Sequence, residues 1–185
     1  LPGLCPHFHL SMQSGCDATL RRMNRKYDTK RYKGSVELLN VYFGRPAITT
    51  DLIVGFPGET EEEFVTTLEF VRACGFAEMH IFPYSIRPGT PAAEMEQVPK
   101  AVKEERSARA AEVAAALNRH YLSGCVGETY AVLYEQEAEG LWTGHAPNYI
   151  LVGAKGQNLH NQVRRTKITG VQGNLLVGEL EETDV

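Results

Sequence analysis

Long apolar runs are missing from this sequence. No stretch approaches the roughly 18 consecutive apolar residues of a membrane-spanning helix, so we predict no membrane partner. The chain does not begin with a basic segment followed by an apolar one, which is the pattern of a signal peptide. It also lacks an initiator methionine at its start. We therefore expect it to be a piece of a longer protein.

Cysteine is sparse and unclustered. The four cysteines are Cys5, Cys16, Cys74 and Cys125. They form no Cys-x-x-Cys pair, and two of them fall where helices should end, so we expect free thiols in a reducing, cytoplasmic location. The count alone also allows two disulfides. His7 and His9 have no third ligand at metal spacing, and we predict no metal site from them.

An excess of positive charge is missing as well. The formal net charge is −4 at pH 7, which argues against a globally basic nucleic-acid-binding protein. Residues 21–33 nevertheless hold seven cations and one anion, interleaved with Tyr27 and Tyr32. Such a block is either a solvated face or a surface that binds a phosphate backbone. With 43% apolar residues, the 185-residue chain has enough material for one large or two modest cores.

The clearest local pattern lies at residues 48–64. Residues 48–54 are mostly apolar and rich in β-branched side chains, which predicts a buried strand. The sequence Gly-Phe-Pro-Gly then turns the chain, and Thr60 with Glu63 three residues later predicts a capping box at the start of a helix. This is one half of a βα unit. Ligands of parallel α/β folds bind at that end of the strands.

Polar residues accompany this strand and the one before it. Asp51 lies within the apolar run, where a carboxylate is costly unless it is paired or faces a polar site. We predict that it points into a cavity, although a generic structural junction remains the alternative. Residues 7–12 predict an earlier strand, which delivers Gln13 and Ser14 to the same edge of the sheet.

The remaining elements of the first half complete an α/β pattern. They are helices at residues 17–23, 29–43 and 61–74 and a third strand at residues 76–84. Thr29 is the predicted cap of the second helix. Alternating strands and helices predict parallel strands with right-handed crossovers. Three strands do not close a barrel, and a parallel sheet needs cover on both faces. We therefore expect neighbouring strands before Leu1, and the unclosed sheet edge invites self-association.

The second half changes character. Residues 98–123 predict a long helix that ends at Gly124. Short strands follow at residues 130–134, 148–152, 163–169 and 175–180, with a further one at residues 141–145. They predict a small antiparallel β-barrel of the oligonucleotide-binding type. We divide the chain into residues 1–97, a linking helix at residues 98–124 and a barrel at residues 125–185.

Four stretches in order resemble one enzyme family. They are His9–Gly15, Asp17–Tyr27, Thr50–Thr60 and Phe82–Thr90. Together they are similar to the second half of the radical S-adenosylmethionine (SAM) domain of the methylthiotransferases. The C-terminal strands resemble the TRAM domain of those enzymes, an RNA-binding module. The resemblance implies the C-terminal half of a partial (βα) radical SAM barrel, followed by the small barrel.

Two segments resemble the MtaB branch of the family most closely, residues 1–20 and Gly144–Val152. That branch methylthiolates N6-threonylcarbamoyladenosine at position 37 of tRNA, so the resemblance implies the tRNA anticodon arm as partner. The MiaB branch modifies isopentenyladenosine, and the RimO branch modifies a ribosomal-protein aspartate. Alternatives are another radical SAM enzyme, such as one acting on a porphyrin or a cobalamin-assisted substrate, and a non-catalytic RNA-binding module.

The resemblance implies SAM and 4Fe–4S clusters in the full-length enzyme. The Cys-x-x-x-Cys-x-x-Cys loop of the family is absent here, and Cys5 and Cys16 do not have its spacing. Thiolates are the usual ligands of such clusters. We therefore expect this chain to hold no cluster and to perform no chemistry by itself.

The resemblance also assigns site residues. Asp51 is the catalytic candidate. The predicted contacts to SAM come from Gln13, Ser14, Gly55, Glu59, Phe82 and Tyr84, and Arg87 would meet a carboxylate of SAM or of the threonyl group. The residues expected to bind RNA are Arg21, Arg22, Arg25, Lys26, Arg164, Arg165 and Lys167. His145 and Tyr149 would stack on bases or, alternatively, fill the barrel core.

Overall fold

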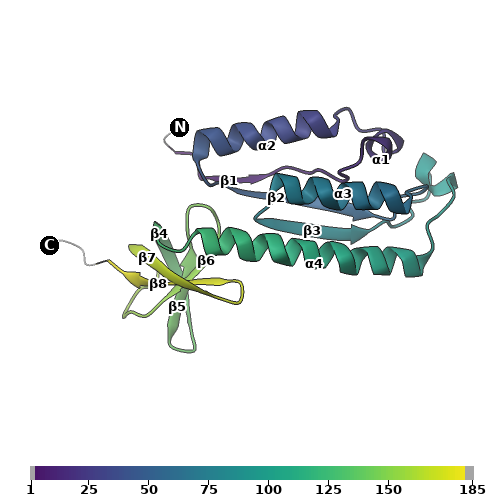
Figure 1. Cartoon of the computed structure of the whole chain (residues 1–185). Helices are drawn as coiled ribbons and strands as arrows, with labels where there is room; N and C mark the ends of the chain where they lie inside the picture. The colour runs from purple at the N-terminus through teal and green to yellow at the C-terminus, as the bar shows by residue number, and fades with distance from the viewer. Residues whose placement is uncertain (1–2, 182–185) are drawn as a thin grey trace. The chain divides into compact units, whose positions relative to one another are not determined.

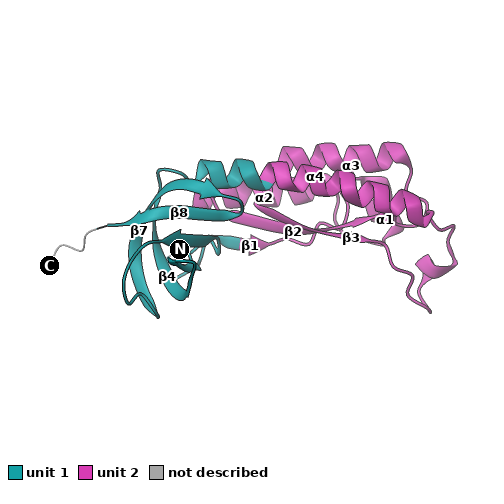
Figure 2. Cartoon of the chain, turned by 90° about the horizontal axis from the view of Figure 1, so that it is seen from below, with its two compact units in different colours: residues 1–7, 118–185 teal, residues 8–117 magenta. Residues whose placement is uncertain are grey.

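The computed structural model describes residues 3–181, which form two compact units. One unit contains residues 8–117, and the other contains the described residues 3–7 and 118–181 (Figure 2). The division falls within the long helix α4, Lys100–Gly124, so the predicted linking helix is shared between the units. The predicted outer domain limits, residues 1 and 185, lie outside the described residues.

The first unit is a parallel α/β layer (Figure 1). Its strands are β1, His7–His9, β2, Ala47–Val54, and β3, Glu78–Pro83, in the order β1-β2-β3. Its helices before α4 are α1, Asp17–Arg22, α2, Thr29–Phe43, and α3, Glu61–Cys74. Strands β2 and β3 pair in parallel, with Asp51 opposite His80. This confirms the predicted strand–helix alternation, although β1 is shorter than the predicted strand.

Side-chain caps fix the helix starts. Helix α3 has the predicted capping box, in which Thr60 accepts a hydrogen bond from the Glu63 amide and Glu63 accepts one from the Thr60 amide. The predicted cap of α2 is wrong by one residue. Asp28, in extended backbone conformation, accepts from the Arg31 amide at 2.7 Å and is the N-cap, while Thr29 is the first helical residue. An aspartate caps at least as well as a threonine.

The core of the first unit lies between one face of the sheet and its helices. Strand β2 contributes Ile48, Leu52 and Val54, and α3 contributes Phe64 and Val71. Helices α2 and α4 add further buried residues, among them Tyr32, Val36, Ala110 and Val113. Successive residues of a strand point to opposite faces. Thr49, Asp51 and Ile53 therefore face away from this core, which leaves them for a site.

A 3₁₀ turn, η1, Pro91–Glu94, lies between β3 and α4. Helix α4 begins two residues later than predicted. The Pro99 carbonyl accepts hydrogen bonds from the amides of Val102 and Lys103. None of the helices described between residues 3 and 181 combines the length and apolarity that a membrane span requires. Over the same residues, all four cysteines are free thiols.

The second unit is built on a closed five-stranded barrel with strand order β4-β5-β6-β8-β7. Its strands are β4, Thr129–Ala138, β5, Leu141–His145, β6, Leu151–Ala154, β7, Gln162–Gln172, and β8, Leu175–Leu180. All neighbours are antiparallel except β6 and β8. The interior is packed by buried side chains, including Val132, Tyr134, Ile168 and Leu176. The prediction of a small β-barrel is confirmed, including its fifth strand.

Candidate functional site

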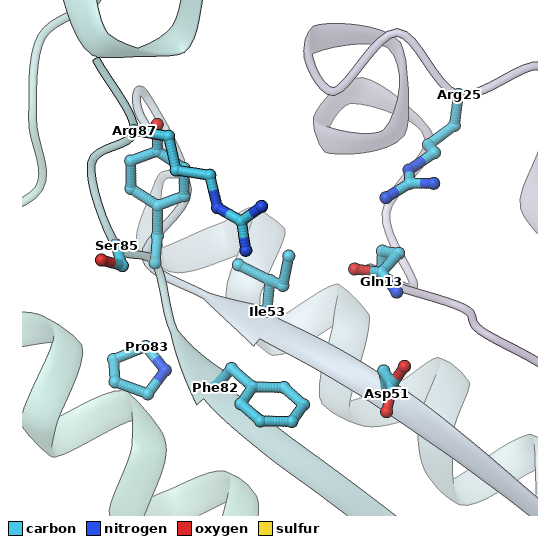
Figure 3. A pocket seen from close by; sticks show the side chains of 9 residues that line it. Gln13, Arg25, Asp51, Ile53, Phe82, Pro83, Ser85 and Arg87 are labelled. Atoms are coloured by element: carbon cyan, nitrogen blue, oxygen red, sulfur yellow. The ribbon is translucent and has the colours of Figure 1, made fainter. Parts of the chain in front are cut away.

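A pocket of about 450 Å³ lies at the carboxyl ends of the parallel strands (Figure 3). It is lined by Gln13, Arg25, Asp51, Ile53, Phe82, Pro83, Tyr84, Ser85 and Arg87. Five of these nine were predicted as site residues for SAM or catalysis, and Arg25 was predicted to bind RNA. The pocket combines apolar surface from Ile53 and Phe82 with charged groups from three other residues. Such a mixture suits an organic ligand that carries polar groups.

Backbone pairing places Gln13 beside β2. The Gln13 amide donates to the Asp51 carbonyl, and the Gln13 carbonyl accepts from the Ile53 amide, both at 2.9 Å. Gln13 has a φ of 68°, an uncommon conformation for a residue other than glycine. Such backbone strain gathers at functional sites. The chain beyond β1 thus continues along β2 and brings its polar side chain to the pocket.

Asp51 lies in a small polar network on the face away from the helices. Its Oδ2 atom is 3.2 Å from His9 Nε2 and accepts from the Ser11 hydroxyl at 3.2 Å. The other ring nitrogen of His9 lies 2.9 Å from Thr49 Oγ1. The Asp51 side chain is 25% exposed, so the carboxylate is accessible while its orientation is held. His9 and Ser11 were not predicted as site residues.

Two arginines approach the pocket from different elements. Arg25 follows α1, Arg87 follows β3, and the guanidinium groups of both are directed into the space between them (Figure 3). Neither guanidinium group makes a hydrogen bond or an ion pair within residues 3–181. The pocket therefore carries two uncompensated positive charges beside the one carboxylate of Asp51.

The turn after β2 is braced by α4. Gly55, with a φ of 67°, donates its amide to Glu59 Oε1 at 3.0 Å. The same carboxylate oxygen accepts from Arg106 Nη1 at 2.8 Å, and Arg106 and Glu59 are only 4% and 7% exposed. Burial raises the pKa of Glu59 above its ordinary value, although the Gly55 amide and Arg106 oppose this effect. The Glu59 side chain does not line the pocket.

Lys103 completes this brace. Its ammonium group donates to the Tyr84 carbonyl at 3.0 Å and lies 5.5 Å from the centre of the Tyr84 ring. A Cβ atom at Gly55 would overlap with the Lys103 side chain, so glycine is required there for close packing as well as for its conformation. Lys103 and Arg106 were not predicted as site-supporting residues. The only signal was a pair of cations three residues apart on a helix.

Ser14 lies outside the pocket. It is buried, its hydroxyl lies 3.3 Å from Thr67 Oγ1, and it accepts from the Cys16 amide at 3.2 Å. These contacts fix the loop before α1. The predicted contact of Ser14 with SAM stays a prediction, as do the contacts of Gly55 and Glu59.

The basic stretch is not uniformly available to a ligand. Arg22 binds the Glu63 carboxylate through both terminal nitrogens. Lys26 donates to the Asn24 side chain at 2.9 Å, and Arg21 is exposed. Of the predicted phosphate contacts in this stretch, Arg22 is thus engaged by a carboxylate and Arg25 is directed to the pocket.

The barrel unit presents an aromatic pair. His145 and Tyr149 stack with ring centres 4.7 Å apart and an angle of 17° between the rings, and Tyr149 is 65% exposed. His145 Nδ1 lies 2.7 Å from Glu135 Oε2. The alternative that Tyr149 fills the barrel core is therefore wrong. Its ring is available for stacking on a base.

The cations on β7 have protein partners. Arg165 Nε donates to Glu181 Oε2 at 2.7 Å, and Lys167 donates to the Gly127 carbonyl. Arg164 is partly exposed. Arg165 and Lys167 remain exposed in spite of these contacts. Whether these three cations bind RNA stays a prediction.

Comparisons with known proteins show what this chain is similar to. Residues 2–71 match the model of the Radical SAM superfamily. The chain is 47% identical over 133 residues to a tRNA-2-methylthio-N(6)-dimethylallyladenosine synthase of Mycobacterium avium, covering 71% of this chain and 19% of that protein. It is 39% identical over 169 residues to the threonylcarbamoyladenosine tRNA methylthiotransferase MtaB of Bacillus subtilis, covering 88% of this chain and 38% of that protein.

Two further matches also cover only part of the matched protein. A second dimethylallyladenosine synthase, from Mycolicibacterium vanbaalenii, is 39% identical over 190 residues, which cover 96% of this chain and 37% of that protein. Among solved structures, coproporphyrinogen III oxidase (HemN) of Escherichia coli matches 58% of this chain and 27% of its own, with a TM-score of 0.49 and 21% identity. The chain thus spans well under half the length of these relatives.

Proposed function

This chain carries part of a radical SAM domain and is related to tRNA methylthiotransferases, and on that premise we propose that it is the C-terminal part of such an enzyme. The whole enzyme adds a methylthio group to C2 of an N6-modified adenosine in tRNA. The observation that carries the proposal is similarity over 71–96% of this chain to proteins named for this reaction.

The pocket residues suit the organic part of SAM. Ile53 and Phe82 offer apolar surface for an adenine ring, and the side-chain carboxamide of Gln13 is available to ribose hydroxyls. SAM, when bound and reductively cleaved in the whole enzyme, supplies the radical that removes the hydrogen atom from C2. The proposed role of this chain is to bind and orient SAM and to exclude water from the pocket. Asp51, held by His9 and Ser11, supplies a fixed carboxylate at the edge of that space.

An iron–sulfur cluster does not fit the residues described here. Within residues 3–181, no three His, Cys, Asp or Glu side chains lie close enough together to hold a metal ion. Three of the four cysteines are buried, and Cys74 has a pKa raised to about 11 by burial. Since thiolates are the ligands of such clusters, we assign no step of the reaction to a cluster held by these residues.

For the substrate, we propose N6-threonylcarbamoyladenosine. A threonyl group carries a carboxylate, and the two uncompensated arginines of the pocket suit such a group better than an apolar dimethylallyl chain. Residues 1–20 and Gly144–Val152 also resemble the MtaB branch. The second candidate is the dimethylallyl substrate, which is favoured by higher identity, 47% against 39%, over a shorter stretch.

The barrel is proposed to hold the anticodon arm. The stacked pair of His145 and Tyr149 supplies an exposed aromatic surface, and Arg164, Arg165 and Lys167 supply charge. Phosphate contacts of this kind release counterions, so binding is expected to weaken steeply as salt rises. The cytoplasmic location and the self-association through the sheet edge stay predictions.

One experiment separates the two substrates. The full-length enzyme, with its clusters reconstituted, is given tRNA carrying either modified adenosine together with SAM and a reductant. The tRNA is then digested to nucleosides, and their masses are measured by mass spectrometry. A gain of a methylthio group on threonylcarbamoyladenosine alone supports the proposed substrate. Modification of dimethylallyladenosine alone transfers the assignment to the second candidate. No product from either tRNA, with intact SAM cleavage, contradicts the methylthiotransferase assignment.

A further inference from the structure

Tyr149 presents its ring from a backbone conformation that a bulky residue rarely adopts. Its φ is 64°, in the left-handed region, and the residue is 65% exposed. The loop that it ends joins β5 to β6 and is closed by two hydrogen bonds: the Tyr149 amide donates to the Ala146 carbonyl at 2.8 Å, and the Ala146 amide donates to the Ile150 carbonyl at 3.0 Å. Short hairpin loops usually have glycine at their left-handed position. The fold alone would therefore favour glycine here, and backbone strain of this kind gathers at functional sites.

A buried polar contact holds this loop to α4. Asn148, the residue before Tyr149, is only 1% exposed, and its Nδ2 atom donates to the Tyr121 hydroxyl at 3.0 Å. Tyr121 lies in the last turns of α4 and is 7% exposed. Within residues 3–181, the Asn148 Oδ1 atom has no hydrogen-bond partner. The bond to Tyr121 is therefore the one polar attachment of this side chain, and a hydrogen bond in such a dry environment is stronger than one in water.

The ring beneath Tyr149 is held from the barrel itself. His145, at the end of β5, pairs with Leu151 of β6, and its Nδ1 atom lies 2.7 Å from Glu135 Oε2. The Tyr149 ring stacks on His145, while the His7 ring lies 5.3 Å from Tyr149 at an angle of 47°. The strands thus fix one ring of the stack, and the loop fixes the other. A ring that is ordered before a ligand binds loses less freedom on binding, which improves affinity.

We propose that Asn148 and Tyr121 are positioning residues that orient the Tyr149 ring for stacking on an unpaired base of RNA. The inference rests on the proposed function, in which the barrel holds the anticodon arm. Asn148 and Tyr121 are both buried, so they act on the RNA only through Tyr149. Of these residues, only Tyr149 and its partner His145 were predicted from the sequence.

A double-mutant cycle separates positioning from a general effect on the barrel. In the whole 185-residue chain, Asn148→Ala is compared with the wild type, and the same change is made in the Tyr149→Ala background. Tyr121→Phe, which keeps the ring and removes the hydroxyl, is measured in the same two backgrounds. The control is Asn158→Ala, at an exposed asparagine between β6 and β7. Fluorescence anisotropy gives the affinity for an anticodon stem-loop, at a temperature at which circular dichroism shows every variant to be folded.

Positioning predicts an effect that depends on the Tyr149 ring. Asn148→Ala and Tyr121→Phe are each expected to weaken binding by at least about threefold when Tyr149 is present, and by less than about 1.5-fold in the Tyr149→Ala background. A residue that only stabilises the barrel would have the same effect in both backgrounds, and that result overturns the proposal. Effects no larger than that of Asn158→Ala overturn it as well.

A second measurement needs no RNA. In the free chain, the Tyr149 ring shifts the NMR signals of the His145 ring protons because the two rings stack. Loss of this shift in both variants is expected, and an unchanged shift overturns the positioning role whatever the affinities are. If Tyr149→Ala itself leaves RNA binding unchanged, the proposed RNA surface is wrong even where the shift is lost. The failure of the positioning role and the failure of the proposed function are thus distinguished.

Discussion

At the scale of single residues, the pair of Arg22 and Glu63 joins two functions that sequence analysis kept separate. Glu63 was predicted as half of a capping box and Arg22 as a phosphate contact. In the structure the Glu63 carboxylate performs the capping role and also binds Arg22. The hydrogen bond from Arg22 lowers the pKa of Glu63 below its ordinary value of 4.5. The pair therefore ties the start of α3 to the end of α1.

This lowered pKa predicts a pH dependence of stability. A carboxyl group with a lowered pKa in the folded state contributes stability above its unfolded pKa and loses it as the pH falls through the folded value. We expect Glu63→Gln, which keeps a capping acceptor, to destabilise this chain at pH 6 and to approach the wild type as the pH falls through the lowered pKa of Glu63. Urea unfolding across this range measures the difference.

A matched control isolates the effect of the pair. Glu69 is an exposed carboxylate on the same helix. Glu69→Gln is expected to change the free energy of unfolding by less than about 0.5 kcal/mol at any pH. A Glu63→Gln variant whose loss of stability stays constant from pH 6 down to the lowest pH at which the chain is folded would show that the charge of Glu63 contributes nothing.

At the scale of elements, α4 braces the site, and its central contact is the buried pair of Arg106 and Glu59. The two residues are far apart in sequence, and the Glu59 carboxylate also accepts a hydrogen bond from the Gly55 amide. Arg106 and Arg109 lie over the Phe64 ring, at 5.4 and 4.9 Å from its centre. The turn after β2 is thus held by the Glu59 carboxylate and, through Arg106, by α4.

Removal of one partner of this pair is expected to be costly. Arg106→Met leaves the Glu59 carboxylate buried without its counter-charge, and such losses amount to about 3–5 kcal/mol. The double variant Arg106→Met/Glu59→Gln removes both charges and is expected to recover part of that loss. Chemical denaturation of the 185-residue chain provides the free energies. Arg109→Met, at a partly exposed pair, is the control and should cost less than about 1 kcal/mol. A loss for Arg106→Met no larger than for Arg109→Met would refute the brace.

The elements themselves were largely predictable from sequence. The β-branched run before Gly55 and the capping box at Thr60 fix β2 and α3 through local physics alone. Asp28 and Thr29 are adjacent caps of similar strength, so the pattern placed the start of α2 only to within one residue. The pair of Arg106 and Glu59 joins residues 47 positions apart, and no local pattern reports such a contact. The direction of Arg25 is likewise set by a turn whose conformation the sequence does not specify.

At the scale of the whole molecule, the chain contains two units with separate chemistries. The α/β unit holds a pocket with charge suited to a small anionic group, and the barrel unit holds an exposed aromatic pair. The net charge of −4 means that RNA binding, if it occurs, depends on local groups. Since several exposed cations of the barrel already have protein partners, stacking is expected to carry much of the affinity.

The exposed ring of Tyr149 therefore gives the sharpest test of the barrel. Stacking of one base on an aromatic side chain is worth about 1–3 kcal/mol, so Tyr149→Ala is expected to weaken binding of this chain to an anticodon stem-loop by about 5- to 150-fold. The control is Tyr42→Ala, at a tyrosine of α2 that is 74% exposed. Fluorescence anisotropy at two salt concentrations measures both variants. Stacking predicts that the ratio of the Tyr149→Ala and wild-type affinities is unchanged by salt, since no phosphate contact is lost. Equal effects of the two substitutions would instead show that Tyr149 is a surface residue without a role in binding RNA.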